Sequence, residues 1–147
     1  MKKLLFLLVC VCTMQFVWAS DDKPIRFEQL PQTAQTFVKK HFPGLKVAFT
    51  KADKGWFDTS YDVVFVDGSK LEFDKNGAWK EVKCKGTFVP DAVVPAPVMK
   101  YIKANYPDAK VLQLERDRNE FEVLLSNFWK IKFDTDFNVI DLDHDKD

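Results

Sequence analysis

Hydrophobic and polar positions alternate along this chain with two distinct periods, and the longer period predicts helices. Apolar residues recur every three to four positions after Leu30-Pro31, and the residues on that face are Ala34, Phe37, Val38 and His41. The same spacing follows Val94-Pro95, and the corresponding residues are Val98, Tyr101, Ile102 and Asn105. Proline is tolerated at the first position of a helix. The pattern therefore predicts two helices, each opened by a proline.

The shorter period, two residues, is typical of strands with one buried face. Apolar side chains alternate with polar ones in three runs after the first helix, and the inward positions are Leu45, Val47, Phe49, Tyr61, Val63, Phe65, Leu71 and Phe73. Asp67-Gly68 and Asn76-Gly77 follow the last two runs, and both dipeptides favour tight hairpin turns. A final apolar run ends at Cys84. These signals predict a helix followed by a four-stranded antiparallel meander.

This pattern occurs twice. Residues 30–47 align without gaps on residues 94–111, with five of 18 positions identical, and residues 61–74 align on residues 121–134, with four of 14 identical. Self-similarity of this kind indicates repeated structural units. We therefore predict an α+β fold built as a tandem repeat of a helix plus a four-stranded antiparallel sheet. Residues 26–86 form the first unit and residues 87–145 the second, with the two sheets joined or closely docked.

Alternation along the strands also divides the predicted sheet into two faces. The positions expected to form the helix-facing core are Tyr61, Val63, Phe65, Leu71, Phe73, Phe121, Val123, Leu125, Trp129, Ile131 and Phe133. The opposite face is mixed and is expected to be solvated or to contact a partner.

The first nineteen residues are typical of a secretory signal peptide. Lys2 and Lys3 precede an apolar stretch, residues 4–12, and Val17-Trp18-Ala19 is a small-x-small cleavage site. The sequence therefore predicts that residues 1–19 are removed and that the protein is periplasmic or secreted, with no membrane span after cleavage. A retained membrane anchor is the alternative.

Composition excludes several function classes. Removal of the two lysines in residues 1–19 leaves 20 basic against 22 acidic residues, and no basic stripe suited to nucleic acid is visible. The predicted mature chain keeps one cysteine, Cys84, so a disulfide framework is excluded and a buried apolar role is expected. Neither histidine lies beside a nucleophile, and we predict no catalytic residues, no cofactor and no enzyme activity. The oligomeric state is left open.

The residues resemble a known family. Its pattern is Leu-Pro at a helix start, aromatic-Pro-Gly at its end, an aromatic-acidic-Val strand, Asp-Gly, Phe-Asp and Gly-x-Trp. In this chain these elements are Leu30-Pro31, Phe42-Pro43-Gly44, Tyr61-Asp62-Val63, Asp67-Gly68, Phe73-Asp74 and Gly77 with Trp79. They resemble the PepSY-like domain of exported bacterial proteins, described as β-lactamase-inhibitor-like. The resemblance implies helix-plus-four-strand units whose strands can join, and a periplasmic binding or inhibitory role.

Differences between the two copies suggest where a partner binds. Asp67-Gly68 corresponds to Asn127-Phe128, and Asn76-Gly77 corresponds to Asp136-Phe137. Because phenylalanine adopts a positive φ at a cost, the second copy is expected to change its turn geometry at both tips. The first copy has four extra residues around Trp56 and Phe57. Exposed aromatics anchor many interfaces. The candidate partner-binding residues are therefore Trp56, Phe57, Phe128 and Phe137, and the alternative is that they pack against the core.

We therefore predict a non-catalytic binding module that recognises a periplasmic protein or peptide, and that acts as an enzyme inhibitor if a loop enters the partner's cleft. A structural or ion-responsive envelope protein is the alternative. It rests on a series of side chains that carry oxygen ligands, Asp134, Asp136, Asn138, Asp141, Asp143, Asp145 and Asp147. Hard cations prefer such oxygen ligands, but the glycine and glutamate of a calcium-binding EF-hand loop are missing. No metal ligand is assigned.

Overall fold

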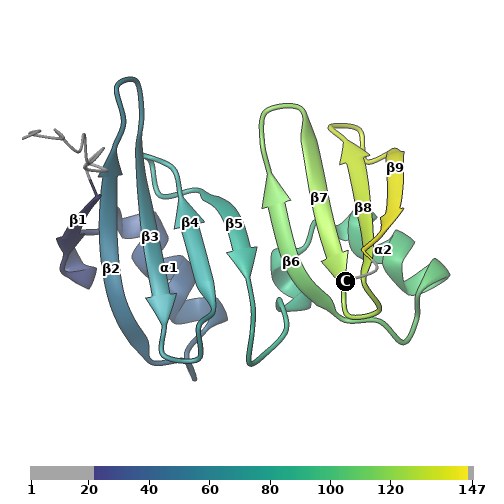
Figure 1. Cartoon of the computed structure of the whole chain (residues 1–147), viewed down its shortest axis with the longest axis horizontal. Coiled ribbons are helices and arrows are strands. Elements are labelled where there is room, and N and C mark those ends of the chain that lie inside the picture. Colours follow the sequence, from purple (N-terminus) through teal and green to yellow (C-terminus); the bar gives the residue numbers. More distant parts are fainter. Residues whose placement is uncertain (1–21, 146–147) are drawn as a thin grey trace, which may run out of the picture.

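The computed structural model describes residues 22–145, which form one antiparallel sheet of nine strands in chain order, β1 to β9 (Figure 1). The elements, in order, are β1 (Asp22–Ile25), η2 (Phe27–Gln29), α1 (Gln32–His41), β2 (Val47–Lys54), β3 (Thr59–Phe65), β4 (Lys70–Phe73), β5 (Trp79–Lys83), η3 (Asp91–Val93), α2 (Ala96–Asn105), β6 (Val111–Arg116), β7 (Glu120–Leu125), β8 (Trp129–Asp134) and β9 (Val139–His144). The predicted signal peptide, residues 1–19, lies outside the described residues.

The predicted fold class, two units that each carry a helix and a four-stranded sheet, is wrong. The strands form a single sheet, because β5 pairs with β6 through Val82 and Leu114 and the pairs on either side of them. A further strand, β1, pairs with β2 and lies ahead of the predicted first strand. An unpaired strand edge exposes its backbone hydrogen-bonding groups. Pairing β5 with β6 removes two such edges and makes the sheet continuous.

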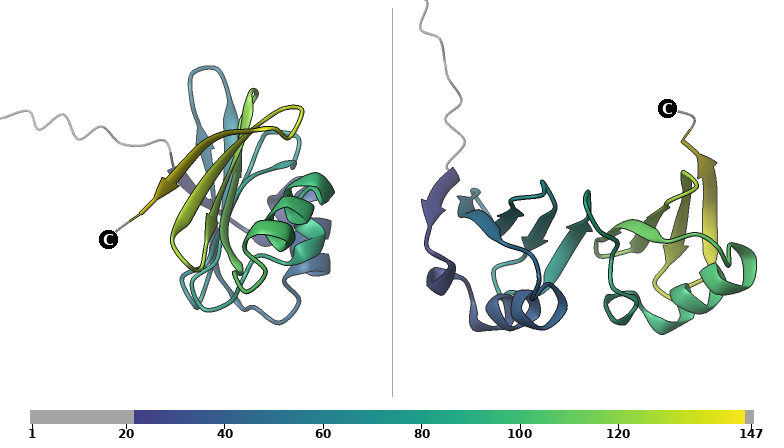
Figure 2. Two further views of the ribbon diagram at one scale, coloured as in Figure 1. Left: turned by 90° about the vertical axis from the view of Figure 1, so that its right-hand side faces the viewer. Right: turned by 90° about the horizontal axis from the view of Figure 1, so that it is seen from below.

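Both helices cover the same face of the sheet, as the two rotated views show (Figure 2). Pro31 and Pro95 are the N-cap residues of α1 and α2. The sequence predicted each proline at the first helical position, so both helices begin one residue later than predicted. Helix α1 ends at His41, and Phe42 is its non-helical C-cap, because the residue before a proline, here Pro43, avoids the helical region. Ala34, Val38, Val98 and Ile102 are buried, which confirms the centre of each predicted inward face. Phe37, His41 and Tyr101 are half-buried, and Asn105 is exposed, so its predicted inward position is wrong.

The core lies between the helices and the sheet. Eight of the eleven predicted core residues are fully buried, and they are Val63, Phe65, Leu71, Phe73, Val123, Leu125, Ile131 and Phe133. The other three, Tyr61, Phe121 and Trp129, are partly buried and pack against the same cluster. Cys84 is a free thiol, 5% exposed, as expected for a buried apolar residue.

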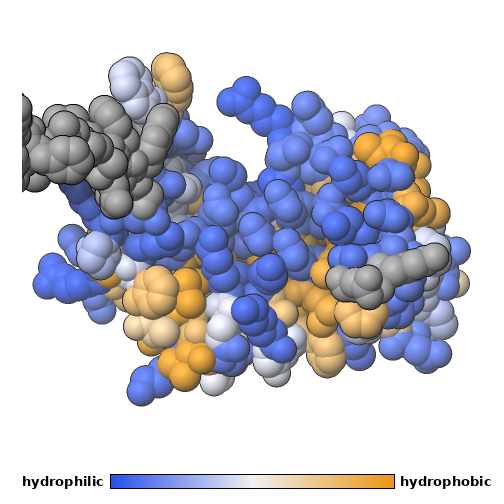
Figure 3. All heavy atoms as spheres, in the orientation of Figure 1, coloured by the Kyte–Doolittle hydropathy of each residue, from blue (hydrophilic) through white to orange (hydrophobic). Residues whose placement is uncertain are grey.

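The face opposite the helices, here called the open face, is mainly hydrophilic at its centre (Figure 3). Five acidic residues lie directly opposite one another on successive strands, and this acidic row is Asp62, Glu72, Glu81, Glu115 and Glu122. Lysines flank the row, and Lys70 and Lys132 form ion pairs with its two ends at 3.4 and 3.6 Å. Like charges directly opposite one another destabilise a sheet. The row is therefore an unfavourable feature that the fold tolerates.

The turns of the second half keep the geometry of the first, so the predicted change at both tips is wrong. Phe128 and Phe137 adopt φ values of 67° and 64°, close to the 88° and 82° of Gly68 and Gly77. The closing hydrogen bonds also match: the amide nitrogens of Gly68 and Phe128 each donate across 2.9 Å to the third carbonyl upstream. Pairing of the flanking strands fixes the turn, and the phenylalanine backbone accommodates it.

Candidate functional site

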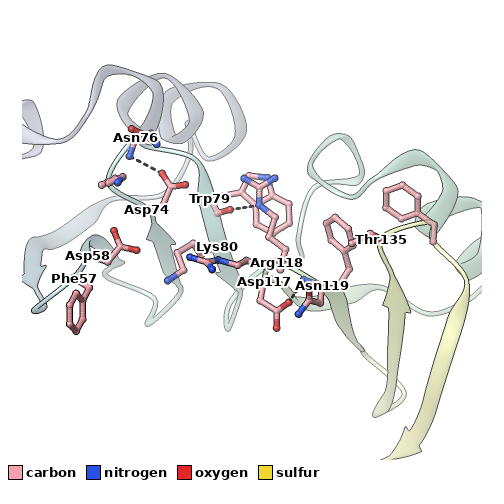
Figure 4. Close-up of a pocket in the computed structure, with 14 residues that line it drawn as sticks. Phe57, Asp58, Asp74, Asn76, Trp79, Lys80, Asp117, Arg118, Asn119 and Thr135 are labelled. Carbon is pink, nitrogen blue, oxygen red and sulfur yellow. Dashed lines mark hydrogen bonds between the residues drawn. The ribbon is translucent and has the colours of Figure 1, made fainter.

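A cleft of about 970 Å³ lies at the end of the sheet where the β2–β3, β4–β5, β6–β7 and β8–β9 connections meet (Figure 4). Each connection contributes residues to its wall, because strands of a meander return to the same end at every second turn. The lining residues are Phe57, Asp58, Asp74, Lys75, Asn76, Trp79, Lys80, Arg116, Asp117, Arg118, Asn119, Phe121, Thr135 and Phe137.

An arginine stacked on a tryptophan lies at the centre of the cleft. The guanidinium carbon of Arg116 lies 4.3 Å from the centre of the Trp79 ring, and its Nε donates a hydrogen bond to the Trp79 carbonyl oxygen at 2.6 Å. These contacts connect β5 with β6 at the end of their pairing. Burial lowers the pKa of Arg116, and the nearby Asp74 opposes that shift. Arginine stays charged even so, so a cation is held in a fixed orientation in the cleft wall.

The three aspartates of the cleft accept hydrogen bonds from backbone amides of their own turns. Asp74 accepts from Asn76 and Ala78 at 2.8 and 3.0 Å. Asp117 accepts from Asn119 and Glu120 at 2.7 and 3.0 Å, and Asp58 accepts from Thr59 at 3.0 Å. This is the usual role of aspartate in turns. The carboxylates therefore stabilise the loops around the cleft.

The basic residues of the cleft make fewer polar contacts with the chain than the aspartates do. Lys80 forms an ion pair with Glu72 at 3.5 Å. Within residues 22–145, no ion pair is formed by Arg116, Arg118 or Lys75. The cleft thus combines three aspartates, each with one carboxylate oxygen bound by amides of its own turn, with three cations that form no ion pair within residues 22–145.

Two of the four predicted partner-binding residues line this cleft. Phe57 is 97% exposed at the tip of the β2–β3 hairpin, which extends beyond the neighbouring β4–β5 turn (Figure 1). Its neighbour Trp56 is 96% exposed at the same tip. Phe137 is half-buried and its ring stacks on Phe121 with centroids 5.2 Å apart. Phe128 is 54% exposed and lies at the opposite end of the sheet, in the β7–β8 turn.

Sequence reasoning did not assign Trp79 and Arg116 to a site. Trp79 was visible as part of the Gly-x-Trp element, but Arg116 follows an ordinary strand pattern. The two residues are 37 positions apart and meet only because β5 pairs with β6. No local signal in the chain indicates that contact.

The structure gives the acidic β8–β9 turn a structural role. The carboxylate of Asp134 accepts hydrogen bonds from the backbone amides of Asp136 and Asn138, both at 2.9 Å. These bonds lower the pKa of Asp134. Across residues 22–145, no group of three or more histidine, cysteine or acidic side chains is arranged to hold a metal ion.

A family model described as "Putative beta-lactamase-inhibitor-like, PepSY-like" matches residues 59–141, more than half of the chain. The chain belongs to the PepSY-like family. The resemblance noted from the sequence is confirmed at the level of the family. No curated protein is significantly similar to this PepSY-like chain.

Three solved structures resemble this PepSY-like protein. A Bacteroides vulgatus protein described as a "putative periplasmic protein" of the DUF2874 family is 62% identical, with a TM-score of 0.84 and coverage of 86% of this chain and 99% of the other. A "putative calcium-regulated periplasmic protein" of Bacteroides thetaiotaomicron is 53% identical, with a TM-score of 0.82 and coverage of 86% and 99%. A second B. vulgatus periplasmic protein of unknown function is 39% identical, with a TM-score of 0.77 and coverage of 83% and 98%.

These relatives agree with the predicted localisation, and the PepSY-like protein is periplasmic. Within residues 22–145, no helix is long and apolar enough to cross a membrane. None of the descriptions names an enzymatic activity.

Proposed function

We propose that this PepSY-like protein is a non-catalytic binding module that recognises a protein or peptide in the periplasm. The observation that carries the proposal is the tip of the β2–β3 hairpin, where Trp56 and Phe57 are 96% and 97% exposed. Large aromatic side chains are enriched at interfaces, where they supply much of the binding energy. Two adjacent aromatics with almost no contact to their own chain are suited to burial in a partner.

The cleft extends this surface. Phe57 and Asp58 line one side of it, and Thr135 lies at the other side, with Trp79 between them (Figure 4). A partner seated on the hairpin tip would therefore also contact the β4–β5 and β6–β7 turns. Phe128 lies at the other end of the sheet and is outside this surface, and Phe137 contributes to the cleft wall through its stack on Phe121.

The family description suggests an inhibitor as the specific form of this module. The β2–β3 connection would act as the inserted segment, because its tip residues Gly55, Trp56 and Phe57 are exposed. An inhibitor of this kind blocks an enzyme by filling its cleft.

The proposal is tested by capture from a periplasmic extract on immobilised protein beginning at Ser20. Three proteins are compared: the parent, a Trp56→Ser/Phe57→Ser variant, and a Phe128→Ser variant as the matched control at the opposite end. All three are first shown to have equal circular dichroism and equal urea midpoints. The expected result is a partner retained by the parent and by the control, and lost by the double variant. Equal retention by all three proteins would rule out the hairpin tip.

A second candidate function is regulation by calcium, because one relative, 53% identical, is described as calcium-regulated. Within residues 22–145 no three histidine, cysteine or acidic side chains are already arranged as a metal site, so calcium would have to gather its ligands on binding. The acidic β8–β9 turn offers the exposed carboxylate of Asp136, which accepts no hydrogen bond in this part of the chain. Calcium binding at this turn would raise the melting temperature in millimolar calcium relative to a chelator, and Asp136→Asn would abolish the rise. An unchanged melting temperature would exclude this function.

A further inference from the structure

The Arg116 side chain is already ordered before any ligand arrives. The stack on Trp79 and the hydrogen bond to the Trp79 carbonyl fix the plane of the guanidinium. Holding Nε in this way leaves the two terminal nitrogens available, and these form the fork that recognises carboxylates through paired hydrogen bonds. Because the orientation exists in the folded protein, little side-chain entropy is lost when an anion binds.

The charge balance of the cleft selects the sign of the ligand. One carboxylate oxygen of each of Asp58, Asp74 and Asp117 accepts hydrogen bonds from amides of its own turn. Arg116 and Arg118 form no ion pair within residues 22–145, and Arg116 is partly desolvated. Asp74 is close enough to favour the charged guanidinium of Arg116 but forms no ion pair with it, so a ligand carboxylate would supply a direct contact that Asp74 does not. The cleft lining also carries four basic side chains against three aspartates. The cleft therefore favours a negative ligand group over a positive one.

The aromatic residues beside Arg116 select what accompanies the anion. Phe121 and Phe137 form a stacked pair in the cleft wall, and Phe57 is almost fully exposed at its rim. These rings offer apolar contact to a side chain next to the charged group. A small inorganic anion would leave that surface unused, whereas a peptide carries both features at once.

We propose that the cleft binds an acidic peptide segment, with a glutamate or aspartate carboxylate of the partner on the Arg116 fork and an adjacent apolar side chain against the Phe121–Phe137 pair. This inference rests on the proposed binding function and names the chemistry of its partner. Trp79 is a positioning residue in this arrangement, because it acts on the ligand through Arg116.

The probe is a pair of synthetic peptides, acetyl-Gly-Glu-Phe-Glu-Gly-amide and its glutamine counterpart, acetyl-Gly-Gln-Phe-Gln-Gly-amide. Each is titrated into ¹⁵N-labelled protein beginning at Ser20, and the Arg116 Nε–H and Trp79 indole N–H resonances are followed. The expected result is a saturable shift of both resonances with the glutamate peptide. The dissociation constant of the glutamine peptide should be at least about tenfold larger, because charge-assisted hydrogen bonds are roughly twice as strong as neutral ones. Equal affinity of the two peptides, or no binding of either, would overturn the proposal.

Three variants separate a ligand contact from a structural role. Arg116→Gln removes the charge, Arg116→Lys keeps the charge without the fork, and Lys100→Gln on the exposed side of α2 is the control. We expect the preference for the glutamate peptide over the glutamine peptide to be lost in Arg116→Gln, reduced in Arg116→Lys and unchanged in Lys100→Gln. If Arg116 acts only by joining β5 to β6, Arg116→Gln lowers the urea midpoint while its folded form keeps the preference, and that result would contradict the proposal.

Two different results would separate loss of the acidic-ligand proposal from loss of the proposed binding function. A partner captured through Trp56 and Phe57 that the glutamate peptide does not displace would leave the binding module in place and remove the acidic ligand. Loss of hairpin-dependent capture would remove the binding module itself.

Discussion

The ring of Phe137 stacks on the ring of Phe121 with centroids 5.2 Å apart, although the Phe137 backbone has a φ of 64°. A positive φ costs an L-residue about 1–2 kcal/mol. The stack offsets that cost, since aromatic pairs contribute about 0.5–1.5 kcal/mol beyond their burial. Phe128 has nearly the same φ, 67°, but its ring is 54% exposed. The same backbone strain is therefore compensated at one turn and largely uncompensated at the other.

Glycine substitutions at these two turns should have opposite effects. Phe128→Gly relieves strain and loses little packing, so the free energy of unfolding should rise by about 0.5–1 kcal/mol. Phe137→Gly also loses the stack and its apolar burial, so stability should fall by about 1 kcal/mol. Urea unfolding followed by tryptophan fluorescence measures both. A loss of stability in Phe128→Gly would contradict the account of the strain.

The two turn glycines should differ in their tolerance of alanine. A Cβ at Gly77, where φ is 82°, would lie 2.9 Å from the Ala34 backbone nitrogen, which is fixed at the start of α1. A Cβ at Gly68, where φ is 88°, would meet only the flexible Lys85 side chain, at 3.1 Å. Gly68→Ala should cost about 1 kcal/mol, the cost of the backbone conformation alone. Gly77→Ala should cost at least about twice that amount in thermal unfolding, and equal costs would exclude the clash.

Removing one charge from the acidic row should stabilise the sheet at neutral pH. Partial desolvation of the carboxylate by the surrounding strands, although its side chain is exposed, and then the neighbouring Glu81, Glu122, Glu72 and Asp117 raise the pKa of Glu115. A raised pKa in the folded state means that the stability Glu115 contributes is full below its unfolded pKa and is lost as the pH rises through the folded pKa.

Glu115→Gln should therefore be more stable than the parent at pH 7 by roughly 0.5 kcal/mol, a value typical of one unfavourable cross-strand pair at an exposed position. The difference should disappear at pH 3, where the carboxyl is protonated in both states, and should shrink in 1 M salt. Urea midpoints at pH 3 and pH 7 check this. Lys75→Gln, at an exposed turn position outside the row, is the control.

The Cys84 thiol should be inert in the folded protein. Burial, with a smaller effect of Asp67, raises its pKa to about 11. The thiolate is the reactive form, so labelling with iodoacetamide at pH 8.5 should be at least about tenfold slower than in urea. The unfolded thiol ionises at a lower pH, so the parent should lose stability between about pH 9 and 11 relative to Cys84→Ala. Equal labelling rates in folded and unfolded protein would contradict the burial.

Local pattern was sufficient for much of the fold. The prolines before Gln32 and Ala96 indicated where the helices begin, and the spacing of Ala34 and Val38 indicated the buried face. Two-residue alternation assigned Val63 and Leu71 to the core in the same way. Such signals work because backbone sterics and the period of each element act within a few residues of the chain.

One strand shows where local pattern fails. Alternation placed Val47 and Phe49 on the same inward face, but a bulge lies between them, and Phe49 is 52% exposed while Thr50 is 3% exposed. A bulge shifts every later side chain to the other face. The bulge disrupts strand pairing only locally, whereas the stability it provides depends on what the sheet packs against. The sequence of the strand therefore does not reveal the bulge.

By itself the sequence determined the family, the export of the protein, the positions of the helices and most of the inward faces. It also pointed to the exposed aromatics Trp56 and Phe57, because an insertion between two strands must extend their hairpin. Only the tertiary structure decided that β5 pairs with β6 in one sheet, and only that pairing brings Arg116 onto Trp79. The physical reason is that strand pairing between distant segments depends on which edges the whole chain leaves open, whereas helices and turns are set by their nearest neighbours in sequence.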